Sequence, residues 1–318
     1  MALDLLDASF SCREKLQHLF ALVSEIVGKD MIALLRSCEP EILKRTDVSQ
    51  PAITLANLAA ATCLIENGIR PCGCAGFSLG EYTALVVAGV ISVEDCFTLV
   101  TARGKAMQTA TDRIKNNTDS TADEEAGMAA VIGLRPEKVE ELIKKWKDTK
   151  NPVLQELYAA NFNSPKQTVL SGSGKALAEA ETLFTDTNAD GFIRLEVAGP
   201  FHSPFMAQAA EEFRSVLEKA VFNDPVLPLY SNVSGKLIST GEQAKKMALL
   251  QITGAVRWTD EEAAIKAEAE TEAAGGFDTC LEAGPGKVLQ RLWRDSGSTI
   301  PCLPAGTAAA ISKLISNG

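Results

Sequence analysis

Residues 76–81 read Gly76-Phe77-Ser78-Leu79-Gly80-Glu81, which is a Gly-x-Ser-x-Gly pattern. The preceding residues 70–75 are apolar and rich in Cys and Gly, and residues 82–88 have helical character. A strand, a sharp turn and a helix in this order predict a nucleophile elbow, with the serine hydroxyl at the positive end of the helix. Both glycines are expected to be required, because neighbouring chain passes close to such a turn. The alternative is a Gly-rich turn with an incidental serine, since five-residue patterns recur by chance.

The periodicity on both sides of this turn predicts an α/β protein. Residues 1–46 place apolar side chains at helical spacing, and residues 51–66 predict a nearly all-apolar helix. From residue 199 onwards, predicted helices alternate with predicted strands. This order favours an α/β-hydrolase-like large domain with a parallel central sheet, made of residues 1–126 and 199–318. Its later elements are helices at 204–220, 241–252 and 261–272 and strands at 227–232 and 277–282.

A different pattern separates the two parts of this large domain. The polar run at 115–126 predicts a surface loop. After it, residues 127–198 predict the order βαββαβ, which is typical of a ferredoxin-like domain. We therefore expect a small ferredoxin-like domain inserted into the large one. Its strands are expected at 128–134, 153–162, 168–171 and 192–197, and its helices at 136–147 and 175–185.

The composition narrows the class of protein. The chain has 318 residues, 46% of them hydrophobic and 23% charged, which is typical of a soluble globular protein. Its net charge of −10 argues against a nucleic-acid partner and requires local cations wherever an anion binds. The uncharged residues 48–65 contain several polar side chains, so we expect a buried helix and no membrane segment. The acidic start does not resemble a signal peptide.

The eight cysteines have neither the spacing of a zinc site nor that of a redox motif. Most of them lie in apolar runs, so we expect reduced, buried thiols in a reducing compartment.

The chain has only two histidines, which restricts the choice of a base for Ser78. His18 lies on an amphipathic helix and is expected to be a partly exposed helix residue. His202 lies in the Gly/Pro-rich segment 199–204, between a predicted strand and a predicted helix. Loops of this type often carry catalytic groups on a rigid scaffold, so His202 is the candidate base. Its position alone leaves a structural loop histidine as the alternative.

Several segments together resemble a known family. The motifs of malonyl-coenzyme A:acyl carrier protein transacylases, and of the related acyltransferase domains of polyketide synthases, occur here in family order over residues 1 to about 294. The family's arginine lies 25 residues after the serine and falls on Arg103, which on its own would be taken for a surface residue. The other matching segments are Gly76–Glu81, Gly199–Ser203, Ser231–Gly235, Gln251–Trp258, Glu282–Gly286, Asn161–Pro165 and Val169–Gly172.

The resemblance implies a set of roles. Ser78 would be the acylated nucleophile, His202 its base, and Arg103 the partner of the malonyl carboxylate, which its planar guanidinium suits. The N–H of Leu79 would face the oxyanion, and the carbonyl of Gln251 would orient the histidine. Phe201 is associated in related domains with a preference for malonyl over methylmalonyl groups. Asn161 is also implied at the substrate site.

The same resemblance implies a reaction. Malonyl-CoA, as substrate, would transfer its malonyl group through Ser78 to the phosphopantetheine thiol of acyl carrier protein, with ping-pong kinetics, in fatty acid biosynthesis. No cofactor, metal, nucleic acid or membrane is implied. A monomer is expected, in the cytoplasm or in an organelle stroma or matrix. Two alternatives remain: a serine esterase or thioesterase, which needs an acidic third triad member, and a catalytically impaired relative that serves as a binding subunit.

The chain departs from the family at two places. Phe77 stands where the family usually has a histidine, which removes a polar contact beside the nucleophile. Family members also open with a strand that ends in Gly-Gln-Gly, whereas this chain begins at what resembles the methionine after it. We expect a truncated sequence, with a naturally shortened enzyme as the alternative. Loss of the oxyanion donor that this loop supplies would cost about 2.7–4 kcal/mol.

Overall fold

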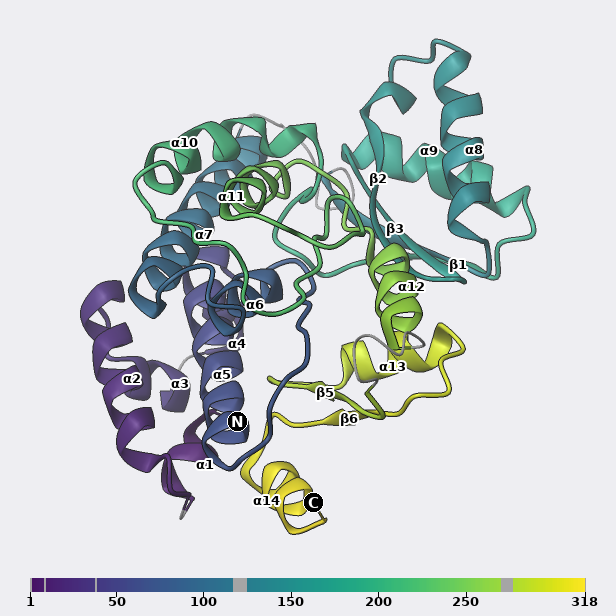
Figure 1. Ribbon diagram of the computed structural model, residues 1–318. Coiled ribbons are helices and arrows are strands. Elements are labelled where there is room, and N and C mark those ends of the chain that lie inside the picture. Colours follow the sequence, from purple (N-terminus) through teal and green to yellow (C-terminus); the bar gives the residue numbers. More distant parts are fainter. Residues whose placement is uncertain (1, 9, 38, 117–124, 270–276, 318) are drawn as a thin grey trace.

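A computed structural model describes residues 2–8, 10–37, 39–116, 125–269 and 277–317 (Figure 1). Most of the polar run predicted as a loop at 115–126, and the end of the helix predicted at 261–272, lie outside these residues. The described α-helices are α1 (Ala2–Asp7), α2 (Arg13–Val27), α3 (Met31–Ser37), α4 (Pro40–Leu43), α5 (Thr46–Glu66), α6 (Gly80–Val87), α7 (Val93–Asn116), α8 (Pro136–Asp148), α9 (Gly174–Thr185), α10 (Ala207–Leu217), α11 (Gly241–Leu250), α12 (Trp258–Ala269), α13 (Val288–Asp295) and α14 (Ala308–Asn317). The strands are β1 (Gly127–Ile132), β2 (Leu157–Ser164), β3 (Gln167–Gly172), β4 (Gly191–Arg194), β5 (Cys280–Glu282) and β6 (Cys302–Pro304).

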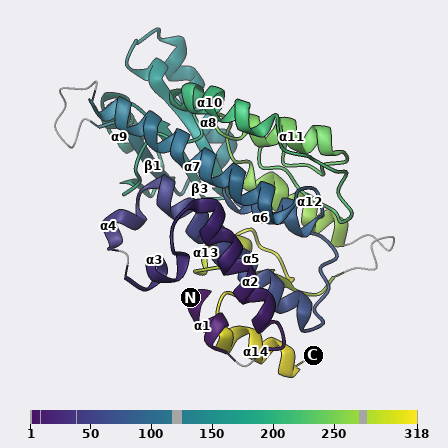
Figure 2. The same ribbon diagram turned by 90° about the vertical axis from the view of Figure 1, so that its left-hand side faces the viewer.

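The main core is built around α5, which lies beside α2 and α7 (Figure 2). By length and composition α5 could cross a membrane, but most of it is buried inside the protein, as expected for the core helix of a globular fold. On the other side of α7 lies α10, so α7 is covered on both faces. The helix after the serine turn, α6, packs against α5 and α7.

Parallel pairing beside the serine turn is shorter than predicted. The strands expected at 70–75 and 227–232 reduce to a parallel bridge between Cys74 and Leu229, in which the Cys74 N–H donates to the Pro228 carbonyl at 2.8 Å. The parallel pair β5–β6 and a parallel bridge between Asn161 and Val256 supply the other parallel pairing of the described residues. The fold is therefore α/β with a mixture of parallel and antiparallel strands.

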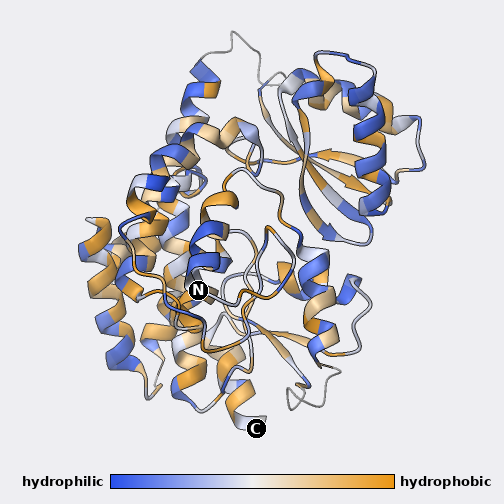
Figure 3. Cartoon of the chain, turned by 45° about the horizontal axis from the view of Figure 1, so that its top comes forward, coloured by the Kyte–Doolittle hydropathy of each residue, from blue (hydrophilic) through white to orange (hydrophobic). Residues whose placement is uncertain are grey.

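Residues 127–194 form a four-stranded antiparallel sheet in the order β2-β3-β1-β4. The helices α8 and α9 cover one of its faces, and Trp146 of α8 meets Phe184 of α9 edge to face (Figure 1). The hydropathy view shows orange strands beneath helices whose outer turns are blue (Figure 3). On the opposite face, Met128 and Val169 pack against Phe201, the residue before His202. The small sheet thus supports the loop that carries the histidine.

The cysteines fit the expectation of buried thiols only in part. Each of the seven that the structure describes is a free thiol, and Cys12, Cys63 and Cys96 are buried. The prediction is wrong for Cys72, which is exposed, because the segment before the serine turn lies nearer the surface than a core strand would. The remaining described thiols, at 74, 280 and 302, are partly exposed.

Candidate active site

The serine turn has the geometry of a nucleophile elbow. Ser78 has a φ of +48°, a left-handed conformation that is strained for a residue with a side chain. A Cβ at Gly76 would lie 2.1 Å from the Gly80 carbonyl group, so only glycine fits there. A Cβ at Gly80 would meet nothing within 4 Å. The expectation that both glycines are required is therefore wrong for Gly80, because no chain passes close to its α-carbon.

His202 lies directly beside Ser78. Its Nε2 atom is 2.8 Å from the Ser78 Oγ atom, and its Nδ1 atom is 2.9 Å from the Gln251 carbonyl and 3.2 Å from the Gly254 carbonyl. Since carbonyl oxygens only accept hydrogen bonds, Nδ1 carries the proton and the Nε2 lone pair faces the serine hydroxyl. The arrangement is that of a nucleophile and its base, with main-chain carbonyls in the orienting position.

The histidine is buried, and this sets its charge. Burial and, to a smaller extent, the positive charge of Arg103 lower the pKa of His202 to about 4, although the two carbonyls act to raise it. His202 is therefore neutral at pH 7 and can accept a proton from Ser78. The second histidine, His18, is exposed on α2, as predicted.

Arg103 is buried in the described fold, although its sequence context alone would suggest a surface residue. Its side chain is 1% exposed. One terminal nitrogen donates to the Gln50 Oε1 atom at 2.9 Å, the other donates to the Gln251 Oε1 atom at 3.1 Å, and the Nε atom has no partner among the described residues. Burial lowers its pKa, but an arginine side chain remains protonated in proteins. A buried guanidinium bonded to two neutral amides keeps its charge available for an anion.

Gln251, just after α11, is hydrogen-bonded to Ser78, His202 and Arg103. Its carbonyl accepts from His202, its Oε1 atom accepts from Arg103, and its Nε2 atom donates to the Ser78 carbonyl at 3.0 Å. The resemblance implied only the contact between its main chain and the histidine. The link from its side chain to the arginine was not predicted, because the sequence gives no sign that α7 and the end of α11 meet.

The other predicted site residues lie around this centre. Leu79 precedes α6, and its N–H has no acceptor among the described residues, as expected of an oxyanion donor. Phe201 is partly buried between the main core and the small sheet. Asn161 lies on β2 in a parallel bridge with Val256, and no described hydrogen bond joins its side chain to Ser78 or His202. Phe77 packs edge to face on Trp258, with ring centroids 5.6 Å apart.

Sequence reasoning missed a group of buried polar residues behind the turn. Asn232 and Glu261 are fully buried, and Glu81 is 1% exposed. Burial raises the pKa of Glu81 to about 7 and that of Glu261 well above its ordinary value. Two of these residues lie in matched motifs, Glu81 in the serine turn and Asn232 in Ser231–Gly235, which was the available signal.

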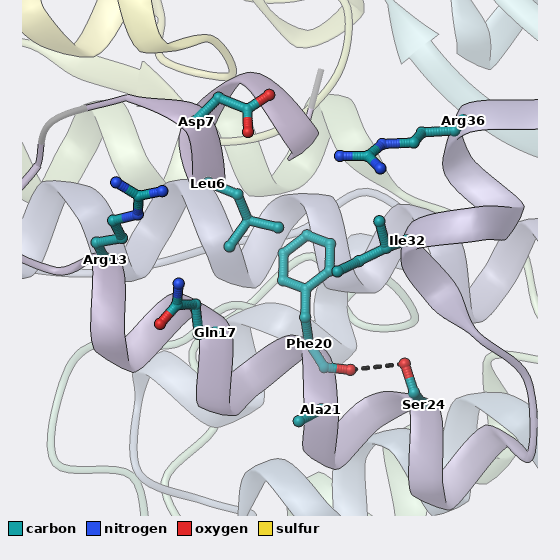
Figure 4. Close-up of a pocket in the computed structure, with 9 residues that line it drawn as sticks. All are labelled: Leu6, Asp7, Arg13, Gln17, Phe20, Ala21, Ser24, Ile32 and Arg36. Atoms are coloured by element: carbon teal, nitrogen blue, oxygen red, sulfur yellow. Dashed lines mark hydrogen bonds between the residues drawn. The ribbon is translucent and has the colours of Figure 1, made fainter.

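A surface hollow of about 270 Å³ lies elsewhere, between α1, α2 and α3 (Figure 4). Phe20 and Ile32 form its apolar floor, with Arg13 and Arg36 at its margins. None of the three residues of the serine centre lines it. This hollow is therefore separate from the candidate active site formed by Ser78, His202 and Arg103.

The fold and this centre agree with what comparison with known proteins finds. The family model described as the acyl transferase domain matches residues 1–312, so the chain belongs to the acyl transferase family. The chain is 34% identical over 276 residues to the malonyl CoA-acyl carrier protein transacylase of Bacillus subtilis, covering 87% of this chain and 80% of that protein. It is 32% identical over 300 residues to the Escherichia coli K12 protein of the same name, covering 93% and 90%.

A solved structure is similar over the whole chain. It is a malonyl-transacylase in complex with its type II polyketide synthase acyl-carrier protein, with a TM-score of 0.84 and 30% sequence identity, covering 100% of this chain and 95% of that one.

Proposed function

We propose that this protein transfers a malonyl group from malonyl-CoA to the phosphopantetheine thiol of an acyl carrier protein, through a malonyl ester on Ser78. One observation carries the proposal: a buried arginine, hydrogen-bonded to no carboxylate among the residues that the structure describes, is joined through Gln251 to both Ser78 and His202. A malonyl thioester has a reactive carbonyl at one end and a free carboxylate at the other, which matches this arrangement. The relatives' names and the neighbour solved with its carrier protein support the same reading.

The first half-reaction forms the ester. The Ser78 Oγ atom attacks the thioester carbonyl carbon, and its proton passes to the His202 Nε2 atom. The N–H of Leu79 donates to the oxyanion of the tetrahedral intermediate. The C–S bond then breaks, and coenzyme A leaves as its thiol with the proton from His202. In the second half-reaction the phosphopantetheine thiol gives its proton to His202, and its sulfur attacks the ester carbonyl carbon. The C–O bond to Ser78 then breaks, and His202 returns the proton to the Ser78 Oγ atom. Kinetics of this kind are ping-pong.

Arg103 selects the acyl group. Two parallel hydrogen bonds from its guanidinium hold the malonyl carboxylate, and Gln50 and Gln251 keep the guanidinium oriented before substrate arrives. A buried cation also offsets the global charge of −10, which otherwise repels an anionic substrate. Phe201 and Asn161 complete the substrate side, at the junction with the small sheet.

We further infer the domain organisation. The four-stranded unit, residues 127–198, is a ferredoxin-like domain inserted into an α/β-hydrolase-like large domain of residues 1–126 and 199–318. The strand order and the two covering helices support this. The protein acts as a monomer in the cytoplasm or an organelle stroma or matrix, without a metal or cofactor, in fatty acid biosynthesis.

Intact-mass spectrometry after mixing with malonyl-CoA tests the proposal. The expected result is a mass increase of one malonyl group, located on the Ser78 peptide and absent from Ser78→Ala. Ser92→Ala is a matched control, because Ser92 caps α7 away from the centre and should leave labelling intact. Wild-type protein that stays unlabelled while folded would contradict the proposal and favour a binding subunit.

The fate of the ester distinguishes a transferase from an esterase. Isolated malonyl-enzyme should hold its label in buffer and lose it rapidly to holo acyl carrier protein. Rapid loss to water alone would indicate hydrolysis. The described geometry favours transfer, because main-chain carbonyls and not a carboxylate orient His202.

A further inference from the structure

We propose that Asn232 is a positioning residue that clamps the Ser78 turn in its reactive conformation. In this conformation the N–H of Leu79, and not that of Ser78, is available to the oxyanion. This inference rests on the proposed nucleophilic role of Ser78. It concerns a residue that touches neither the Ser78 hydroxyl nor the base, and acts through the backbone of the turn.

The side-chain amide of Asn232 bridges the two ends of the turn. Its Oδ1 atom accepts from the Ser78 N–H at 2.6 Å, and its Nδ2 atom donates to the Gly76 carbonyl at 2.7 Å. These two bonds span the residues on either side of Phe77, where the backbone reverses. Ser78 sits there at a φ of +48°, a conformation that persists only when the surroundings hold it.

Both remaining hydrogen-bonding positions of the amide are also filled. The Nδ2 atom donates a second time, to the Glu261 Oε1 atom at 2.8 Å, and the Oδ1 atom accepts a second time, from the Gln251 Nε2 atom at 3.2 Å. An asparagine amide offers two donor hydrogens and one oxygen with two lone pairs, so its capacity is fully used. An ionised aspartate or a leucine, which are similar in size, cannot both donate and accept.

Two buried carboxyl groups fix Asn232 from behind. The Glu81 Oε2 atom on α6 accepts from the Asn232 backbone N–H at 2.7 Å, while Glu261 on α12 holds its side chain. Both residues are almost completely buried, at 1% and 0% exposed. The clamp therefore ties together the helix that follows the nucleophile, the segment after Leu229, and α12, in a region closed to water.

The clamp has a consequence for the oxyanion. The N–H of Ser78 is already bonded to Asn232 and cannot point to a substrate carbonyl. The N–H of Gly80 donates to the Phe77 carbonyl at 2.8 Å, so it too is engaged. Among residues 78–80 this leaves the Leu79 N–H without a described acceptor, at the positive end of α6. Asn232 thus excludes the Ser78 N–H as a donor to the oxyanion.

The reactivity of Ser78 toward a fluorophosphonate probe tests the clamp without requiring malonyl-CoA as substrate. Asn232→Ala removes all four hydrogen bonds and should lower the rate of labelling about 100-fold in protein that remains folded. Asn232→Asp keeps the shape but loses a donor, so its rate relative to wild type should fall as pH rises from 6 to 9 and the new carboxyl ionises beside Glu81 and Glu261. The other charged or basic groups of this region, Arg103 and His202, are present in every variant. The ratio of the variant's labelling rate to the wild-type rate therefore reports the effect of residue 232.

Asn151→Asp is the matched control. Asn151 donates to Glu179 at 2.5 Å and accepts from the Val153 N–H, in the small sheet's unit. The same substitution there also removes a donor to a carboxylate and should leave the labelling rate and its pH dependence at wild-type values. A purely structural role of Asn232 would instead lower the melting temperature and leave the rate per folded molecule unchanged.

Amide hydrogen exchange of the Ser78 turn gives a second readout. The clamp predicts that the Ser78 N–H is protected in wild type and exchanges faster in Asn232→Ala, with no change in Asn151→Asp. Folded Asn232→Ala with wild-type labelling and wild-type protection would overturn the inference, and Asn232→Asp decides in the same way if the alanine variant does not fold. If the probe labels the wild-type protein but malonyl-CoA does not, the proposed function is refuted and the inference about Asn232 is not. If wild type reacts with neither, the exchange comparison still decides the clamp.

Discussion

Replacement of Glu262 by glutamine should stabilise the protein at alkaline pH and have little effect at acid pH. Glu262 lies on α12 and is 0% exposed, and neither of its carboxylate oxygens accepts a hydrogen bond from a described residue. Burial raises its pKa from the ordinary 4.5 to about 7, against the lowering effects of the neighbouring Trp258 side chain and the Lys266 charge. The native protein must therefore bury an unpaired charge whenever this group ionises.

The size and sign of the Glu262 contribution to stability follow from proton linkage. The folded pKa lies above the unfolded one, so the native state binds more protons between pH 4.5 and 7, and stability falls as pH rises through this window. At about 1.4 kcal/mol per pH unit, the group removes about 3 kcal/mol of stability by pH 8.5. Glutamine cannot ionise. Glu262→Gln should then match wild type at pH 4.5 and exceed its unfolding free energy by about 2–3 kcal/mol at pH 8.5.

Urea unfolding at pH 4.5, 6, 7 and 8.5 measures this difference, provided that the m-value does not change. Glu81 shifts in the same direction and His202 in the opposite one, and both remain in the two proteins, so their contributions cancel in the comparison. The Glu262 charge also raises the pKa of Glu261, so its removal lowers that pKa and adds to the stabilisation expected at alkaline pH. Glu242→Gln is the control, because Glu242 is exposed on α11 and should give no pH-dependent difference. An equal difference between Glu262→Gln and wild type at pH 4.5 and 8.5 would refute the burial argument.

Three further predictions concern the site and the core beneath it. Single-turnover acylation of Ser78 should stay level from pH 8 to about 5, because His202 has a pKa of about 4 and remains neutral; an inflection between pH 6 and 7 would contradict this. Gly76→Ala should lose about 1–3 kcal/mol of unfolding free energy and most Ser78 labelling, because its Cβ would overlap the Gly80 carbonyl, whereas Gly80→Ala should keep wild-type stability in urea; equal effects would argue against the turn geometry. Phe213→Ala should cost about 3–5 kcal/mol, since Phe213 is fully buried under Tyr82, yet leave the rate per folded molecule intact; a slower rate at full folding would show that the packing positions α6.

Local motifs made much of the site predictable. The serine turn and the His202 loop each lie within a few residues of sequence, so their glycines and prolines reveal them. The alternation of helices and strands likewise predicted the order of elements in residues 127–194, because each element is longer than its pattern's period. The strands expected at 70–75 and 227–232 were overestimated, since apolar residues alone do not say how far pairing continues.

Long-range polar contacts explain what the sequence did not reveal. Asn232 lies 154 residues from Ser78 and 29 from Glu261, and no local pattern reports such partners. Arg103 is held by Gln50 and Gln251, which approach from α5 and from the residue after α11. The resemblance to a family identified Arg103 by position, but only the fold shows how the charge is held.

Comparison of malonyl-CoA and acetyl-CoA as donors to Ser78 in Arg103→Ala examines the whole arrangement at once. Removal of a charged donor pair should slow acylation by malonyl-CoA about 100- to 10,000-fold. Acetyl-CoA carries no distal carboxylate, so its rate should change less than about tenfold. Arg113→Ala, on the exposed part of the same helix, should leave both rates unchanged. Equal losses for the two donors in folded Arg103→Ala would contradict the claim that this buried guanidinium recognises the acyl group carried by Ser78.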